Sequence, residues 1–216
     1  MLRRSLTTLS LVALAAAPLA AQGADDPTKK VAGSTPLPAG WSGRTDRASD
    51  KLTDAKFVKM GPGFHVTSGP AAIYWSASQS VNGPFVASTT ITQTKAPTHP
   101  EAYGIFFGGK GLDGADQSYF YFLVRGDGKY IVNHRAGSEV HKLVPWTDNA
   151  AVKKQDAAGK ATNTLTVDAS KPDSVRLLVN GTQVTALKAA ADGIVGLRVN
   201  HNLDVHVADF KVTPKK

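Results

Sequence analysis

Two strongly patterned segments around a Gly-Asp-Gly turn constrain this chain more than any other feature. The stretch SYFYFLVRGDGKYIVNHRAG covers residues 118–137, and aromatic and β-branched residues fill both of its arms. Residues 126–128 supply the backbone freedom that a tight turn requires. The pattern predicts a β-hairpin with a three-residue loop in which Arg125 lies opposite Lys129. The alternative two-residue loop would mix charged side chains into the apolar face, which is costly.

Similar strand-like segments occupy most of the rest of the chain. Turn sequences such as Asn180-Gly181 and Asp192-Gly193 separate them, and only residues 149–161 have a helix-forming composition, interrupted by glycine. Short strands, frequent turn residues and no clear amphipathic helix are typical of antiparallel sandwiches. We therefore predict an all-β fold, a two-sheet antiparallel β-sandwich of the jelly-roll type.

The N-terminus has the pattern of an export signal. Two arginines precede the apolar run LTTLSLVALAAAPLA, and small residues follow it. Pro18 interrupts this run, which is shorter than the roughly 20 apolar residues of a membrane span. We expect residues 1–23 to be a signal peptide, residues 24–40 a flexible tether and residues 41–213 the sandwich. No transmembrane segment is then expected after cleavage.

The chain contains no cysteine, and its formal net charge is +8. Export without disulfide bonds fits a bacterial periplasmic or secreted protein. The lysines are scattered, whereas a nucleic-acid site would gather basic and aromatic residues into a stripe. We therefore expect no nucleic-acid partner and at most weak contact with an anionic envelope surface.

The order of several phrases is characteristic: YGIFFGG, YFYFLVRGDGKYIVNHR, VPWTD, NTLTV, SVRLLVNGTQV, GIVGLRV and LDVHVADFKV. Over residues 41–212 this order resembles the concanavalin A-like, laminin G-like sandwiches of exported bacterial proteins. The most similar domains are those described as 3-keto-disaccharide hydrolase-like or as having unknown function. The resemblance implies curved sheets with carbohydrate bound on the concave face or at its rim. Where hydrolase-like relatives have an Asn-Ser-Gly phrase, this chain has AYGIFFGG, and this departure weakens the expectation of hydrolase activity.

Catalytic motifs give little support to an enzyme. Retaining glycosidases place two carboxylates about 5 Å apart, but the two glutamates of this chain, Glu101 and Glu139, do not alternate along an acidic strand. No Gly-x-Ser-x-Gly elbow or phosphate-binding loop is present, and the six histidines lack zinc-site spacing. A hydrolase or lyase that acts on a sugar derivative through His, Asp and Arg remains an open alternative.

One loop has residues suited to a metal ion. In LDGADQS, Asp113 and Asp116 lie among glycines, and calcium favours carboxylates clustered in such loops. The competing interpretation is a surface turn in which aspartate bonds its own backbone. Calcium is the only cofactor that the sequence suggests.

The predicted hairpin also predicts a binding face. Its register places polar and aromatic side chains on the face opposite Phe120 and Phe122, and three more polar residues alternate with apolar ones on later strands. Aromatic rings, amides and guanidinium groups together suit sugar rings and hydroxyls. The predicted glycan-binding residues are Tyr119, Tyr121, Asn133, Arg135, Arg176, Arg198 and Asn200. An envelope domain that binds another protein is a further alternative.

Two tryptophans lie at or near the ends of strand-like segments. Trp75 ends the apolar run AAIYW, and Trp146 stands between Pro145 and Thr147. At such positions an aromatic ring can close the edge of a sandwich or form a platform for a sugar. We expect both rings to be buried plugs.

Overall fold

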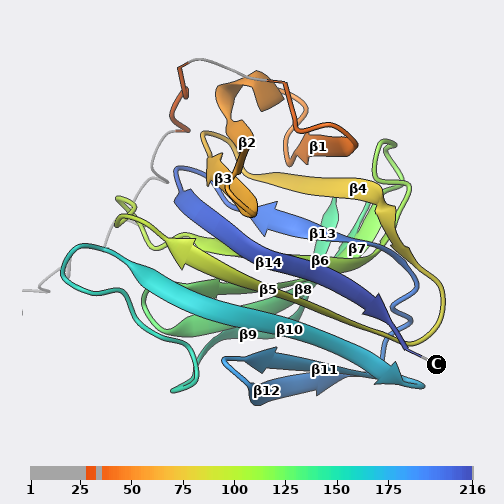
Figure 1. Cartoon of the computed structure of the whole chain (residues 1–216). Helices are drawn as coiled ribbons and strands as arrows, with labels where there is room; N and C mark the ends of the chain where they lie inside the picture. Colours follow the sequence, from red (N-terminus) through yellow and green to blue (C-terminus); the bar gives the residue numbers. More distant parts are fainter. Residues whose placement is uncertain (1–27, 33–35, 216) are drawn as a thin grey trace, which may run out of the picture.

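The computed structural model describes residues 28–32 and 36–215 as two packed antiparallel β-sheets (Figure 1). Sheet I has the strand order β1-β4-β13-β6-β7-β8-β9, and sheet II has the order β12-β11-β10-β5-β14-β3-β2. The predicted two-sheet antiparallel sandwich is confirmed. Within these ranges, no helix is long and apolar enough to cross a membrane.

The strands of sheet I are β1 (Trp41–Thr45), β4 (Ala72–Val81), β6 (Ala102–Lys110), β7 (Ser118–Arg125), β8 (Lys129–Ala136), β9 (Glu139–Asp148) and β13 (Gly193–Val199). The strands of sheet II are β2 (Lys56–Met60), β3 (Gly63–Thr67), β5 (Phe85–Gln93), β10 (Ala161–Lys171), β11 (Ser174–Val179), β12 (Thr182–Leu187) and β14 (Asp204–Pro214). A short 3-10 helix, η1 (Leu52–Asp54), precedes β2.

The two clearest hairpin predictions are confirmed. Arg125 pairs with Lys129 across the three-residue turn, and the pairing continues outward to Ser118 opposite Ala136. At the second hairpin, Asn180 and Gly181 connect β11 to β12 with φ values of 50° and 82°. Positive φ at both central residues is the geometry of a type I′ turn, one of the favoured two-residue turns between antiparallel strands.

The N-terminal segment lies only partly within the described ranges. The predicted signal peptide, residues 1–23, falls outside them. In the predicted tether, residues 24–40, the backbone N–H of Lys29 donates a hydrogen bond of 2.8 Å to Oδ1 of Asn202. Leu37 packs against the core. In its described part, this segment therefore contacts the sandwich.

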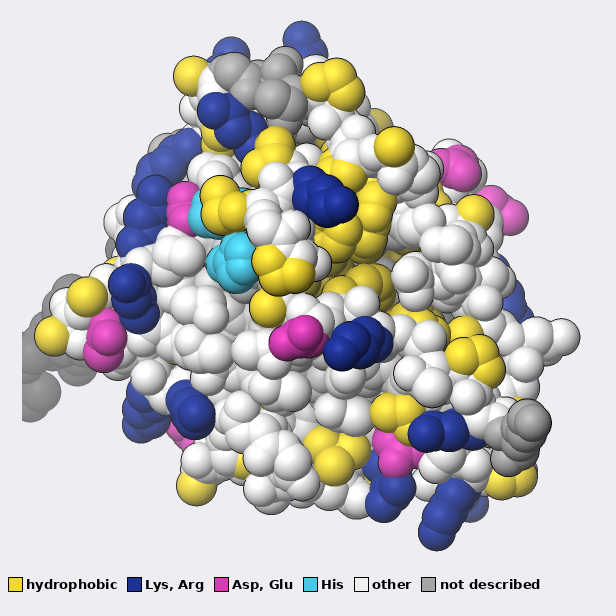
Figure 2. Space-filling view, viewed as in Figure 1, with side chains coloured by type: hydrophobic (Ala, Val, Ile, Leu, Met, Phe, Trp, Pro, Cys, Tyr) yellow, Lys and Arg dark blue, Asp and Glu magenta, His cyan; other side chains and the backbone are white. Residues whose placement is uncertain are grey.

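The main core fills the space between the sheets. Strands of sheet II contribute every second residue to it, as in β5, where buried and partly exposed positions alternate from Phe85 to Gln93. Alternation of this kind is expected for a strand with one buried face. The outward positions of β5 and β10 are mainly Ser and Thr, and Figure 2 shows a broad uncharged polar surface there.

Sheet I is different, because its outer face is also buried. A second apolar cluster covers that face and contains Trp75, Phe106, Tyr119, Tyr121 and Leu123. Strand β6 accordingly has no exposed residue before Lys110. A strand buried on both faces reads as a continuous apolar run, as in the sequence AYGIFF.

Two loops contribute to the cover of this outer face. The loop between β6 and β7 places Leu112 in the outer cluster, and the Arg44 guanidinium holds that loop through a 2.9 Å hydrogen bond to the Leu112 carbonyl. The loop after β1 is held by Arg135, whose Nη2 donates to the carbonyl oxygen of Asp46 at 3.3 Å. The outer face of sheet I is therefore not an open polar surface.

The inter-sheet core makes a direct prediction about stability. Leu165 is fully buried between the sheets, whereas Leu143 on β9 is 43% exposed. Leu165→Ala should lower the free energy of unfolding by about 2–5 kcal/mol, because it removes buried methyl groups and leaves a cavity. The same substitution at Leu143 should cost less than about 1 kcal/mol. Denaturant unfolding of both variants checks this, and equal losses would contradict the assignment of the core.

Candidate functional site

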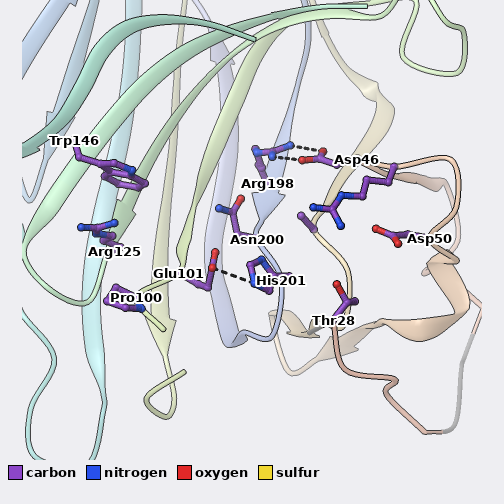
Figure 3. A pocket seen from close by; sticks show the side chains of 12 residues that line it. Thr28, Asp46, Asp50, Pro100, Glu101, Arg125, Trp146, Arg198, Asn200 and His201 are labelled. Carbon is purple, nitrogen blue, oxygen red and sulfur yellow. Dashed lines mark hydrogen bonds and ion pairs between the residues drawn. The ribbon is translucent and has the colours of Figure 1, made fainter. Parts of the chain in front are cut away.

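A cavity of about 480 Å³ lies at one end of sheet I, where the outer cluster stops. We call it the rim cavity. Figure 3 shows Trp146 and Arg125 on one side, Asp46 and Asp50 on the other, and Asn200, Glu101 and His201 between them. Its lining residues are Thr28, Asp46, Arg47, Asp50, Ala71, Pro100, Glu101, Arg125, Trp146, Arg198, Asn200 and His201.

Antiparallel pairing explains how these residues meet. Val199 at the end of β13 pairs with Tyr103 near the start of β6, and Ala102 pairs with Arg125 at the end of β7. The side chains just beyond these pairs therefore gather at one end of the sheet, where β6 begins and β7 and β13 end. The loop after β1 supplies Asp46 from the other side, next to the start of β4.

The most constrained group in the rim cavity is the guanidinium of Arg198. Its side chain is 6% exposed, and its Nη1 lies 2.7 Å from Oδ1 of Asp46 while Nη2 contacts the other carboxylate oxygen. The same Nη1 donates to the Tyr119 hydroxyl at 3.2 Å, and the guanidinium lies 4.6 Å from the centre of the Tyr121 ring. A two-point contact to a carboxylate fixes both the position and the plane of the guanidinium.

The charges of Asp46 and Arg198 shift each other's pKa values. Burial alone would raise the pKa of Asp46, but the nearby Arg198, with Arg135 and Arg47, brings it below its ordinary value. Burial alone would lower the pKa of Arg198, but the carboxylate of Asp46 raises it above its ordinary value. Both groups therefore stay charged at neutral pH, and each neutralises the other.

A second fixed element is the indole of Trp146 on the edge strand β9. The ring is 37% exposed, and the Arg125 guanidinium lies over it at 4.2 Å from the ring centre. Asp127 holds Arg125 in turn, with 2.8 Å from Nε to Oδ1 and 2.7 Å from Nη2 to Oδ2. The hairpin turn thereby positions an exposed aromatic ring at the mouth of the rim cavity. The expectation that Trp146 is a buried plug was wrong, whereas Trp75 is 4% exposed as expected.

Between these two elements lie groups that can exchange hydrogen bonds with a ligand. Nε2 of His201 is 3.2 Å from Oε1 of Glu101. Asn200 projects into the cavity in Figure 3, and its buried Oδ1 has no hydrogen-bond partner within residues 28–32 and 36–215. A buried amide oxygen without a donor is uncommon in proteins, so a hydroxyl group from a ligand or water would complete it.

The structure brings most of the sequence-predicted binding residues together, but beneath the surface. Asn133 Nδ2 donates to the Tyr121 hydroxyl at 2.8 Å, and Tyr121, Asn133 and Arg198 are each no more than 6% exposed. Tyr119 is 1% exposed, and Arg135 turns toward the backbone of Asp46. These residues support the rim cavity from below, and of the predicted set only Arg198 and Asn200 line it.

Arg176 lies elsewhere. It belongs to β11 in sheet II, where it contacts the carboxylate of Asp168 on the neighbouring strand β10. Arg176 therefore lies on the opposite sheet from Arg198. It cannot share a site with the other predicted residues.

The predicted calcium site has few side chains that could serve as ligands. Asp113 and Asp116 are both exposed, and no group of three histidine, aspartate or glutamate side chains suited to a metal ion occurs in the described part of the chain. Two carbonyl oxygens of the loop, those of Leu112 and Gly114, accept hydrogen bonds from Arg44. Because the guanidinium already occupies these oxygens, the loop fits the surface-turn interpretation better than a calcium site.

Sequence reasoning missed Asp46, Arg125 and Glu101 as site residues. Asp46 and Glu101 lie in loops, and the contacts that bring them to Arg198 and His201 span 152 and 100 positions of the sequence. No local pattern indicates such contacts. A signal did exist for the buried outer face, because AYGIFF and AAIYW lack the polar alternation of a solvated strand.

Comparisons with solved structures agree on the architecture. The carbohydrate-binding module CBM66 from Bacillus subtilis is 13% identical, with a TM-score of 0.59, over 81% of this chain and 95% of that one. The metal-free carbohydrate recognition domain of Emp46p (13% identity, TM-score 0.52) covers 81% of this chain and 88% of its own. The match to a galectin-like protein of unknown function from Bacillus subtilis (11% identity, TM-score 0.52) covers 81% of this chain and 89% of that one.

These likenesses show the fold, a galectin-like two-sheet β-sandwich. The expected sandwich fold is thus confirmed, while membership of a particular exported family remains a prediction. No protein-family model matches the sequence, and no curated protein matches it significantly.

The buried ion pair predicts a specific dependence on pH. Asp46→Asn should lower the free energy of unfolding by about 3–5 kcal/mol near neutral pH, because it leaves the Arg198 charge buried without a partner. The pKa of Asp46 is lower in the folded state, so its contribution is present above its ordinary value of 3.8 and is lost as pH falls through the folded value. The difference between the wild type and the variant should therefore shrink below about pH 4.

Denaturant unfolding between pH 3 and pH 7 measures this difference. Asp148→Asn is a matched control, because Asp148 is 72% exposed and lies 3.5 Å from Lys129. Surface pairs of this kind contribute at most about 1 kcal/mol. An Asp46→Asn loss as small as that of the control would contradict the role assigned to the pair.

Proposed function

We propose that this protein is an exported module that binds a glycan in the rim cavity. The observation that carries the proposal is the exposed Trp146 ring, which Arg125 and Asp127 hold at the mouth of a cavity with polar walls. Ligand sites commonly combine a concave surface, an aromatic side chain and a few fixed polar groups. A sugar presents C–H groups to a ring and hydroxyls to amides and carboxylates, and this cavity offers both.

The charge balance of the cavity favours a neutral sugar. Three carboxylates face three guanidinium groups, namely Asp46, Asp50 and Glu101 and Arg47, Arg125 and Arg198. Arg198 and Arg125 are each already paired with an aspartate. A ligand carboxylate would have to compete with Asp46 or Asp127, whereas neutral hydroxyls can use the remaining donors and acceptors without disturbing either pair.

The fold comparison supports the same proposal. CBM66 and the Emp46p domain are named for carbohydrate binding, and both share the sandwich architecture with this chain. The basic and apolar pattern of residues 1–23 supports export, and we place the protein in the periplasm or outside the cell. In this proposal the site lies at the rim of sheet I, not at the centre of a sheet face.

One observation favours a second candidate function, a hydrolase or lyase acting on a sugar derivative. Glu101 and His201 form a carboxylate–imidazole pair at 3.2 Å inside the rim cavity. A histidine oriented by a carboxylate can transfer a proton to or from a bound substrate. Mass spectrometry of array-selected glycans after incubation with the protein distinguishes the candidates, since binding alone leaves the glycan intact.

Replacing the exposed ring tests the binding proposal directly. Trp146→Ala should weaken glycan binding at least tenfold while the protein stays folded, because the ring is exposed and sits on an edge strand. A glycan array identifies the ligand, and calorimetry with wild type and variant measures the loss. Leu143→Ala on the same strand is the matched control and should bind like the wild type. Full binding by the Trp146 variant would overturn the proposed site.

A further inference from the structure

A smaller pocket of about 150 Å³ lies next to the rim cavity, at the same end of the sandwich. We call it the side pocket. Pro100 lines both cavities. Arg125 lines the rim cavity, and its ion-pair partner Asp127 lines the side pocket. The two cavities are therefore neighbours on either side of one proline and one ion pair. The side-pocket residues are Gln93, Pro97, Thr98, Pro100, Gly126, Asp127 and Gln155.

The side pocket contains a buried polar group with an unfilled bond. Gln93 is fully buried at the end of β5, and its Nε2 donates to the Gln155 side chain at 2.8 Å and to the Gly159 carbonyl at 2.7 Å. Its Oε1 has no hydrogen-bond partner in the part of the chain that the structure describes. A buried acceptor without a donor is uncommon in proteins, so a hydroxyl group of a ligand or a water molecule would complete Oε1 of Gln93.

The remaining walls suit a small neutral polar group. Pro97 and Pro100 provide apolar surface, Thr98 and Gln155 provide a hydroxyl and an amide, and Asp127 is already paired with Arg125. The pocket of about 150 Å³ has room for several water molecules, since one water needs at least roughly 10–15 Å³ of such space, and sugar hydroxyls can take their places. Gly126 keeps the pocket open, because an added Cβ would lie 2.7 Å from Oε1 of Gln155 and 3.2 Å from Oε1 of Gln93.

We propose that the side pocket is a second sugar subsite, so that the ligand is a chain of at least two neutral sugar units that passes over Pro100. This inference rests on the proposed function of the rim cavity. One unit stacks at Trp146, and the next places a hydroxyl at Oε1 of Gln93. The Arg125–Asp127 pair serves both subsites, because its arginine faces the first unit and its aspartate faces the second.

The test uses a series of chain lengths. An array carrying glucose, galactose, mannose and fructose, each as a single sugar and as linear oligomers of increasing length, identifies a binding series. Calorimetry of the full chain then compares the single sugar with its oligomers. We expect oligomers to bind at least tenfold more tightly than the single sugar.

Two variants test whether the higher affinity for oligomers depends on the side pocket. Gly126 does not have a positive φ, so Gly126→Ala adds a methyl group without backbone strain. It should reduce oligomer affinity to that of the single sugar and change single-sugar affinity less than twofold. Gln155→Ala should remove part of the gain, and Gln183→Ala, at an exposed glutamine on β12, is the matched control. Thermal unfolding verifies that each variant is folded.

The outcomes separate the two proposals. Equal affinity for single sugars and oligomers, or an oligomer gain that survives in both Gly126→Ala and Gln155→Ala, would overturn the second subsite and leave the rim cavity as a single-sugar site. Absence of binding to every sugar of every length would overturn the proposed function, and the second subsite with it.

Discussion

The constraint on which this structure depends is that sheet I is apolar on both faces. One face meets sheet II across the main core, and the other carries the outer cluster around Phe106, Tyr119 and Tyr121. Exposing that cluster would leave a large apolar surface in water, which folded proteins avoid. The loops after β1 and β6 therefore lie over it, and the rim cavity is the space left where this cover ends.

A buried arginine at that end ties the cover to the sheet. Arg198 is fixed on β13, and Asp46 is in the loop after β1, so their ion pair joins a strand in the middle of sheet I to a loop from its edge. Taking a guanidinium out of water is costly unless a carboxylate accompanies it. The pair thus leaves the loop little freedom to move away. The cavity wall that it forms is also electrically neutral, which supports the proposed preference for neutral hydroxyls over anions.

The sequence was sufficient to predict the fold class and much of the strand pairing. Gly126–Gly128 and Asn180-Gly181 are local turn signals, and each determines the register of its own hairpin. The site could not be predicted in the same way. Tyr121 and Asn133 were expected to face a ligand because they share a face of one hairpin. The two residues do share that face, but the face is buried. The loop that covers them is distant in sequence, and its position depends on tertiary packing.

The edge strand β9 carries several exposed apolar side chains, one of which lies at the proposed glycan site. Val140, Leu143 and Trp146 are each at least 37% exposed on a strand with one unpaired side, a combination that invites pairing with another chain. Pro145 removes a backbone donor immediately before Trp146, and Lys142 adds a charge to the same strand. Both features disfavour the addition of a further strand. The Arg125 guanidinium lies over the Trp146 ring, and both residues line the rim cavity. In the proposed function, a sugar contacts the exposed part of this ring.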